Sequence, residues 1–141
     1  EPLGTGHAVS QVISQIPENH RVLVLYGDTP LVQVTTLEKL ITETEDDALG
    51  LLVSIVTEAK GLGRIIRNDH GEVSAIVEHK DATQEQLQIN EINTGVLTTS
   101  ALLLKKWLPK LKNHNAQGEF YLTDIIAMAV AEKNKLKLHK L

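Results

Sequence analysis

The sequence has 141 residues, the length of one ordinary globular domain, with 42% hydrophobic, 23% charged and only 3% aromatic residues. Its formal net charge of -4 provides no basic surface, so we expect neither a nucleic-acid nor a membrane partner. There are no cysteines, which excludes disulfide frameworks and thiolate metal sites and fits our prediction of a cytoplasmic location.

The chain alternates between segments with helical periodicity and short apolar segments typical of strands. In chain order, the patterns predict a helix over 6–16, a strand over 21–26, a helix from 35, a strand over 49–57, a hairpin of 64–67 and 72–78, a strand over 93–99, a helix ending at 107, a helix over 122–132 and a strand from 136. Thr5, Ser100 and Thr123 are candidate N-caps. Turn residues separate the two period-two arms of the hairpin.

Alternation of helices with buried strands is typical of α/β domains. Short continuous apolar runs, such as 21–26 and 49–57, favour strands that are buried on both faces. We therefore predict an α/β domain with a mixed, mostly parallel sheet, to which the hairpin adds an antiparallel excursion.

Asp28 is the first candidate for chemistry. It follows Gly27 directly after a predicted buried strand, at the end of the strand where open α/β sheets place their ligands. Its carboxylate could hold Mg²⁺ that bridges substrate phosphates, and Gly27 would let a nucleotide approach the backbone. The competing interpretation is an ordinary turn, since Gly-Asp-Thr-Pro is also common turn chemistry.

Two glycine-containing loops are further candidates for ligand contact. The backbone at Gly4 and Thr5 could approach a planar base, or these residues could simply be a glycine-rich start of the first helix. Neither a complete dinucleotide fingerprint nor a Gly-Lys-Ser/Thr phosphate loop is present there. The loop that contains Gly63 either admits a ligand close to its backbone or only turns the chain into the hairpin.

Polar residues later in the chain complete the set of candidates. Glu78 and Asn93, at the ends of predicted strands, could exchange hydrogen bonds with sugar hydroxyls and an amide, or be surface residues or caps. Tyr121 and Thr123 are either the wall of a pocket or the start of the last helix. The histidines form no zinc motif, and neither a Gly-x-Ser-x-Gly sequence nor a cysteine supplies a nucleophile.

Seven short motifs occur in the order and spacing of one family, at residues 3–8, 25–28, 63–65, 76–82, 91–95, 115–119 and 121–124. With these motifs the sequence resembles, over nearly its whole length, the uridylyltransferase domain of the bacterial bifunctional N-acetylglucosamine-1-phosphate uridylyltransferase/glucosamine-1-phosphate N-acetyltransferases. The motifs at 78–82 and 115–119 are specific to this branch, whereas Tyr-Gly-Asp is shared more widely among sugar nucleotidyltransferases. Residue 62 is Leu, where family members commonly carry Tyr.

The resemblance implies a Rossmann-like nucleotidyltransferase fold, Mg²⁺ as cofactor and a specific reaction. UMP would pass from UTP to N-acetylglucosamine 1-phosphate, giving UDP-N-acetylglucosamine and pyrophosphate. Because the attacking phosphate is already anionic at neutral pH, the implied reaction needs no general base, and we predict no catalytic residue. It also assigns roles by position: nucleotide contacts to Gly4, Thr5, Tyr26 and Gly27, the metal to Asp28, and sugar contacts to Gly63, Glu78, Asn93, Tyr121 and Thr123. The parent enzyme would be a homotrimer that also carries an acetyltransferase domain.

Residues 1–141 would form the central and C-terminal part of the uridylyltransferase domain, incomplete at both ends. The family's glycine-rich phosphate loop and second metal ligand would lie outside this sequence, so we expect little activity from these residues alone. Two alternatives stay open: a sugar-nucleotide-binding module without catalytic activity, and a related nucleotidyltransferase that uses another base or sugar.

Overall fold

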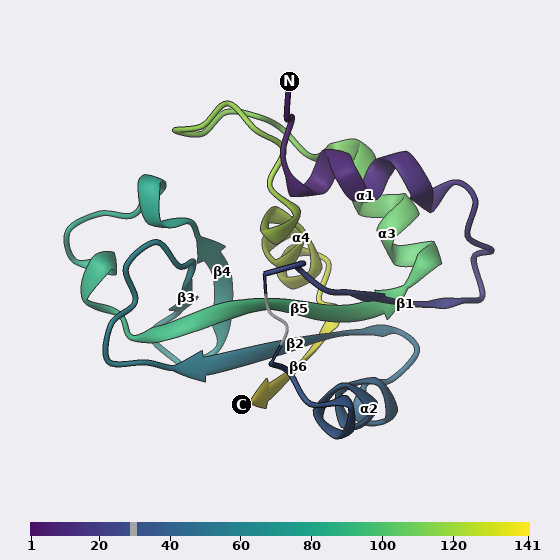
Figure 1. Ribbon diagram of the computed structural model, residues 1–141, viewed down its shortest axis with the longest axis horizontal. Helices are drawn as coiled ribbons and strands as arrows, with labels where there is room; N and C mark the ends of the chain where they lie inside the picture. The colour runs from purple at the N-terminus through teal and green to yellow at the C-terminus, as the bar shows by residue number, and fades with distance from the viewer. Residues whose placement is uncertain (29–30) are drawn as a thin grey trace.

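The computed structural model describes residues 1–28 and 31–141. It contains an open six-stranded sheet with α1, α3 and α4 on one face and α2 on the other (Figure 1). The main elements are α1 (Thr5–Ile13), β1 (Arg21–Val24), α2 (Val34–Glu43), β2 (Ala48–Ile55), β3 (Arg64–Arg67), β4 (Val73–Val77), β5 (Glu91–Ser100), α3 (Ala101–Trp107), α4 (Ile125–Ala131) and β6 (Lys135–Lys140). Short 3-10 turns are η1 (His79–Asp81), η2 (Gln86–Gln88), η3 (Leu108–Lys110) and η4 (Leu122–Asp124). None of the helices described is long and apolar enough to cross a membrane.

The sheet has the strand order β4-β3-β5-β2-β6, and β1 pairs with the C-terminal half of β5. The predicted mixed sheet and the β3–β4 hairpin are confirmed. The prediction that most pairing would be parallel is wrong for the described strands, since only β2 and β6 pair in parallel. The strands β1, β2 and β6 each follow a helix and run in one direction, as helix–strand alternation predicts. However, β5 follows the hairpin instead of a helix and runs antiparallel between β1 and β2.

The β2 strand is buried on both faces, as its continuous apolar run predicts. Leu49 and Leu51 face the main core beneath α1, α3 and α4, whereas Leu52 packs with Leu40 of α2 in a second core. The expectation that the first strand is equally buried is wrong. The β1 strand ends at Val24 and is only half-buried, because β5 is the one partner it has among the described strands.

Of the three predicted N-caps, only Ser100 is confirmed. Its hydroxyl accepts a hydrogen bond at 3.2 Å from a backbone N–H in the first turn of α3. The Thr5 hydroxyl instead accepts from the backbone N–H of Leu122 at 3.0 Å, and the Thr123 hydroxyl donates to Glu78 at 2.9 Å. These long-range partners replace local capping, and the last predicted helix is divided into η4 and α4.

Glu132, directly after α4, ties this helix to α3 and η3. Its carboxylate accepts a hydrogen bond at 3.0 Å from the indole N–H of the fully buried Trp107, and it pairs with Lys106 and Lys110 at 2.8 and 3.2 Å. These partners, with Lys106 contributing most, lower the pKa of Glu132 from 4.5 to about 2. The ionised carboxylate therefore stabilises the folded state.

This ion cluster predicts a pH-dependent stability. Because the pKa is lower in the folded than in the unfolded state, the stabilisation is present above pH 4.5 and lost as the pH falls toward 2. We expect Glu132→Gln to lower the melting temperature at neutral pH and to flatten the loss of stability at acidic pH, as followed by thermal unfolding. The control Glu38→Gln, on the exposed face of α2, should do neither. Equal pH profiles for Glu132→Gln and the unmodified protein would contradict the prediction.

Candidate functional site

The candidate site lies where the chain leaves β1 and passes through Tyr26 and Asp28. One cavity of about 400 Å³ opens toward α1, and a second of about 280 Å³ opens toward the hairpin; both include Tyr26 and Asp28 in their walls. A third, more apolar cavity of about 350 Å³ shares Asp28 and Asn93 with the second. Asp28 therefore stands at the junction of all three, beyond the carboxyl end of β1, where α/β sheets bind ligands.

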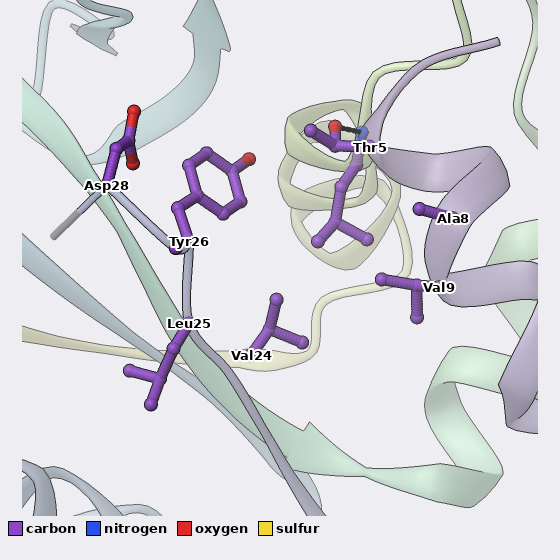
Figure 2. A pocket seen from close by; sticks show the side chains of 9 residues that line it. Thr5, Ala8, Val9, Val24, Leu25, Tyr26 and Asp28 are labelled. Atoms are coloured by element: carbon purple, nitrogen blue, oxygen red, sulfur yellow. Dashed lines mark hydrogen bonds between the residues drawn. The ribbon is translucent and has the colours of Figure 1, made fainter. Parts of the chain in front are cut away.

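Tyr26 separates the first two cavities. Figure 2 shows its ring between Asp28 and Thr5, with the hydroxyl directed toward Thr5 and away from Asp28. Burial raises the pKa of the Tyr26 hydroxyl, and nearby Glu78 and Asp28 raise it further, whereas a hydrogen bond with Thr5 lowers it. The Tyr26 ring lines the first cavity, to which Ala8 of α1 adds an apolar surface.

Three predicted site residues form one row across β4, β3 and β5. Arg64 of β3 pairs with Val77 of β4 on one side and with Ile92 of β5 on the other. One step further along the strands, Gly63 therefore lies between Glu78 and Asn93, and the Asn93 N–H donates to the Gly63 carbonyl at 3.0 Å. Directly opposed residues point to the same face of a sheet. The glycine leaves open the space between the carboxylate and the amide.

The groups in this row have unused hydrogen-bonding capacity. Thr123 donates to one carboxylate oxygen of Glu78 at 2.9 Å, and no group of residues 1–28 and 31–141 donates to the other oxygen, so Glu78 keeps an acceptor in the wall of the second cavity. Burial raises the pKa of Glu78, although the Thr123 hydrogen bond opposes this effect. The side-chain oxygen of Asn93 accepts from the Gly95 N–H at 3.0 Å, so its amide nitrogen is the group available as a donor. The row therefore offers an acceptor and a donor to one ligand.

A β-bulge in β5 gives this part of the site its shape. The register of β5 against β2 shifts next to Gly95, which has a positive φ of 84°. The Thr94 hydroxyl donates to the Leu52 carbonyl at 2.7 Å and anchors the bulge. A Cβ atom on Gly95 would lie only 2.5 Å from the Tyr26 ring, so glycine is needed for the ring to pack there. Bulges often redirect side chains next to sites, as this one does for Asn93.

The structure brings most of the predicted site residues together. Tyr26, Asp28, Gly63, Glu78 and Asn93 line the second cavity, and the first cavity is lined by a set that includes Thr5, Tyr26, Gly27 and Asp28. Their roles in binding stay predictions.

The remaining three predicted residues do not line the first or the second cavity. Gly4, with φ of 104°, packs so closely on the Phe120 backbone that a Cβ atom would be 2.7 Å from its carbonyl oxygen. Tyr121 is buried, and its hydroxyl accepts a hydrogen bond from Gln117 at 3.0 Å. Thr123 supports Glu78, as described above. Of these three residues, Thr123 is the one with a hydrogen bond to a residue that lines the second cavity.

Two residues were missed as contributors to the site. Gly95 lies within one of the family motifs, but no role was predicted for it; a glycine inside a strand pattern is a signal for a bulge. Arg64 is almost completely buried, with 3% of its surface exposed. Arg64 lies within the family motif at 63–65, but the motif predicts no role for it, because two of its partners are backbone carbonyls 25 and 23 residues further along the chain.

Asp28 is the residue that fits a metal ion at the junction of the cavities. It is exposed, and across residues 1–28 and 31–141 no group of three His, Cys, Asp or Glu side chains could enclose a metal. A single carboxylate suits Mg²⁺, which usually keeps several waters and takes further oxygens from substrate phosphates. It does not suit zinc, which needs three or four protein ligands.

Comparison with curated proteins finds relatives for most of this chain. Over 132 residues, 94% of the chain, the sequence is 55% identical to the Bifunctional protein GlmU of Coxiella burnetii, and over 130 residues it is 58% identical to that of Marinobacter nauticus. The chain is homologous to one segment of the GlmU proteins. It spans 29% of the length of these two GlmU relatives. No protein-family profile matches the chain.

The fold of this GlmU-like chain also occurs in a solved structure. A putative glucose-1-phosphate thymidylyltransferase from Bacillus anthracis, in complex with a sucrose, superposes with a TM-score of 0.64. The match covers 100% of this chain and 54% of the other, at 12% sequence identity. At this identity the likeness concerns the fold alone, and it agrees with the predicted Rossmann-like fold.

Proposed function

We propose that the chain is part of an enzyme that transfers UMP from UTP to N-acetylglucosamine 1-phosphate, giving UDP-N-acetylglucosamine and pyrophosphate. The observation that carries the proposal is the position of Asp28, Glu78 and Asn93 in the walls of connected cavities. The similarity to the GlmU proteins and the shared family motifs support it.

The row of Gly63, Glu78 and Asn93 suits the sugar end of the ligand. An N-acetylated sugar presents hydroxyl donors and an amide carbonyl acceptor. Glu78 offers a carboxylate oxygen to the hydroxyls, and the amide nitrogen of Asn93 can donate to the carbonyl. Gly63 allows the sugar ring to approach the strand closely, because no side chain stands between Glu78 and Asn93.

The first cavity suits the nucleotide end. Its walls combine apolar side chains such as Ala8 and Val9 with the Thr5 hydroxyl and the backbone at Gly27. Ligand sites are generally apolar with a few polar groups that fix orientation. The two cavities meet at Asp28, so a nucleotide sugar that fills both places its phosphates next to this carboxylate.

Asp28 would hold Mg²⁺ together with the phosphates, and the ion would neutralise negative charge that develops on them. A sugar phosphate is already anionic at neutral pH, so its attack on UTP requires no general base. The residues of this chain accordingly bind and orient the reactants, which alone can supply a large part of a rate enhancement.

A binding experiment tests this proposal without requiring activity from the chain alone. In calorimetric titrations we expect UDP-N-acetylglucosamine to bind more tightly than TDP-glucose, and Mg²⁺ to strengthen the binding about 3- to 10-fold, as one exposed carboxylate allows. Asp28→Asn should abolish the magnesium effect. Asp69→Asn, at the exposed turn of the hairpin, is the matched control and should retain it.

Other outcomes would favour the alternatives. Equal or tighter binding of TDP-glucose would indicate a related nucleotidyltransferase with another base or sugar. Magnesium-independent binding that Asp28→Asn leaves unchanged would indicate a sugar-nucleotide-binding module without catalysis. No binding of either ligand would refute the site. The acetyltransferase activity and the homotrimer of the parent enzyme stay predictions of the resemblance.

A further inference from the structure

Arg64, the first residue of β3, is a buried cation next to the candidate site. No carboxylate forms an ion pair with it among the described residues. Its Nε donates to the Ile89 carbonyl at 3.0 Å, Nη2 to the Leu87 carbonyl at 3.3 Å, and Nη1 to the Leu62 carbonyl. Nη1 also lies 3.4 Å from Nδ1 of His79. Backbone carbonyls thus satisfy the guanidinium in place of a counter-ion.

Burying the charged guanidinium of Arg64 costs free energy that an apolar side chain at this position would not cost. A buried charge is tolerated only when its hydrogen-bonding groups are satisfied, and an apolar side chain of similar size often gives a fold at least as stable. The guanidinium, in contrast, presents several N–H groups in a rigid planar fork. Arg64 therefore fixes the relative positions of the segments whose carbonyls it holds.

Each segment that Arg64 holds leads directly to the row of Gly63, Glu78 and Asn93. Leu62 precedes Gly63, His79 follows Glu78, and the loop containing η2 runs into β5 shortly before Asn93. The Arg64 side chain does not line the cavities, because neighbouring residues along a strand point to opposite faces of the sheet. The Arg64 side chain therefore lies on the face of the sheet opposite to the row.

We propose that Arg64 is a positioning residue for the ligand site: its guanidinium holds the loops behind the sheet so that Gly63, Glu78 and Asn93 stay aligned, without touching the ligand. The inference deepens the proposed function, on which it rests for the identity of the ligand. It has a ligand-free consequence as well, since the hydrogen bond from the Asn93 N–H to the Gly63 carbonyl should depend on Arg64.

The test compares Arg64→Lys and Arg64→Met with Arg67→Lys. Arg67 lies on the same strand but pairs through two hydrogen bonds with Glu91 at 2.9 and 2.8 Å, away from the cavities. On protein shown to be folded by circular dichroism, Arg64→Lys should weaken UDP-N-acetylglucosamine binding about 3- to 10-fold and leave the magnesium effect intact. Arg67→Lys should leave the affinity unchanged.

Amide hydrogen exchange supplies the second readout. Arg64→Lys should speed the exchange of the Asn93 amide while amides in the β2–β6 pairing keep their protection. Unchanged affinity and unchanged Asn93 exchange, with only a lower melting temperature, would overturn the proposal and leave Arg64 a structural residue. If the unmodified chain binds no nucleotide sugar, the proposed function fails, and the exchange experiment alone decides the role of Arg64. If Arg64→Met does not fold, Arg64→Lys carries the comparison.

Discussion

Replacing Glu78 with Gln is expected to weaken the binding of UDP-N-acetylglucosamine about 10- to 100-fold, because hydrogen bonds to a charged group contribute about 1.5–3 kcal/mol. The two side chains have the same shape, and Gln can still accept the hydrogen bond from the Thr123 hydroxyl. The fold should therefore remain intact. The measurement is calorimetric titration of both proteins, with Glu38→Gln on the exposed face of α2 as the control that keeps full affinity.

The stability of Glu78→Gln should change in the opposite direction from its affinity. Burial raises the pKa of Glu78 above its ordinary value of 4.5, so the ionised carboxylate is costly in the folded state. Its contribution to stability is greatest at acidic pH and is lost as the pH rises through the folded-state pKa. At neutral pH, Glu78→Gln should therefore have a free energy of unfolding equal to or higher than that of the unmodified protein.

The pH dependence of binding separates this explanation from a simple loss of contact area. The affinity of the unmodified protein should fall as the pH is lowered into the range where Glu78 takes up a proton, which begins above the ordinary value of 4.5. The affinity of Glu78→Gln should show no such change. A lower stability together with unchanged affinity would mean that Glu78 is a structural residue.

The sequence predicts the elements around this site better than their relative placement. The hairpin arms, the double-sided burial of β2 and the Ser100 cap follow from local periodicity and local hydrogen bonding. The direction of β5 does not follow from local periodicity. It is set by the connection through η1 and η2, whose residues have no strong hydrophobic periodicity. The alignment of Glu78 with Asn93 depends on that direction, so residue spacing alone left their interpretation open.

The two failed caps show the same limit. Thr5 and Thr123 have the residue type and position of N-caps, yet their hydroxyls bond to groups 117 and 45 residues away in sequence. Local rules give the preferred partner of a hydroxyl only when no better partner is brought close by the fold. The family resemblance predicts that both residues lie near the ligand, and in the structure the Thr123 hydroxyl donates a hydrogen bond to Glu78.

Substituting Gly95 with Ala should be the most damaging single change to the fold around the site. Gly95 has a φ of 84°, and an added Cβ atom would lie 2.5 Å from Cδ2 of Tyr26. We expect a loss of about 3 kcal/mol in the free energy of unfolding, the sum of backbone strain and overpacking. Displacement of the ring and the bulge should also remove nucleotide-sugar binding.

Gly71 offers a matched control for the backbone part of this cost. Its φ is 78°, but apart from its two chain neighbours no described residue has an atom within 4 Å of the Cβ position, so Gly71→Ala should cost only about 1 kcal/mol. The ring contact can then be isolated by repeating Gly95→Ala in a Tyr26→Ala background and measuring unfolding in urea for all variants. Without the ring, the cost of Gly95→Ala should fall to that of Gly71→Ala, because only the backbone strain remains. Equal costs with and without the ring would show that the bulge and Tyr26 are not packed against each other.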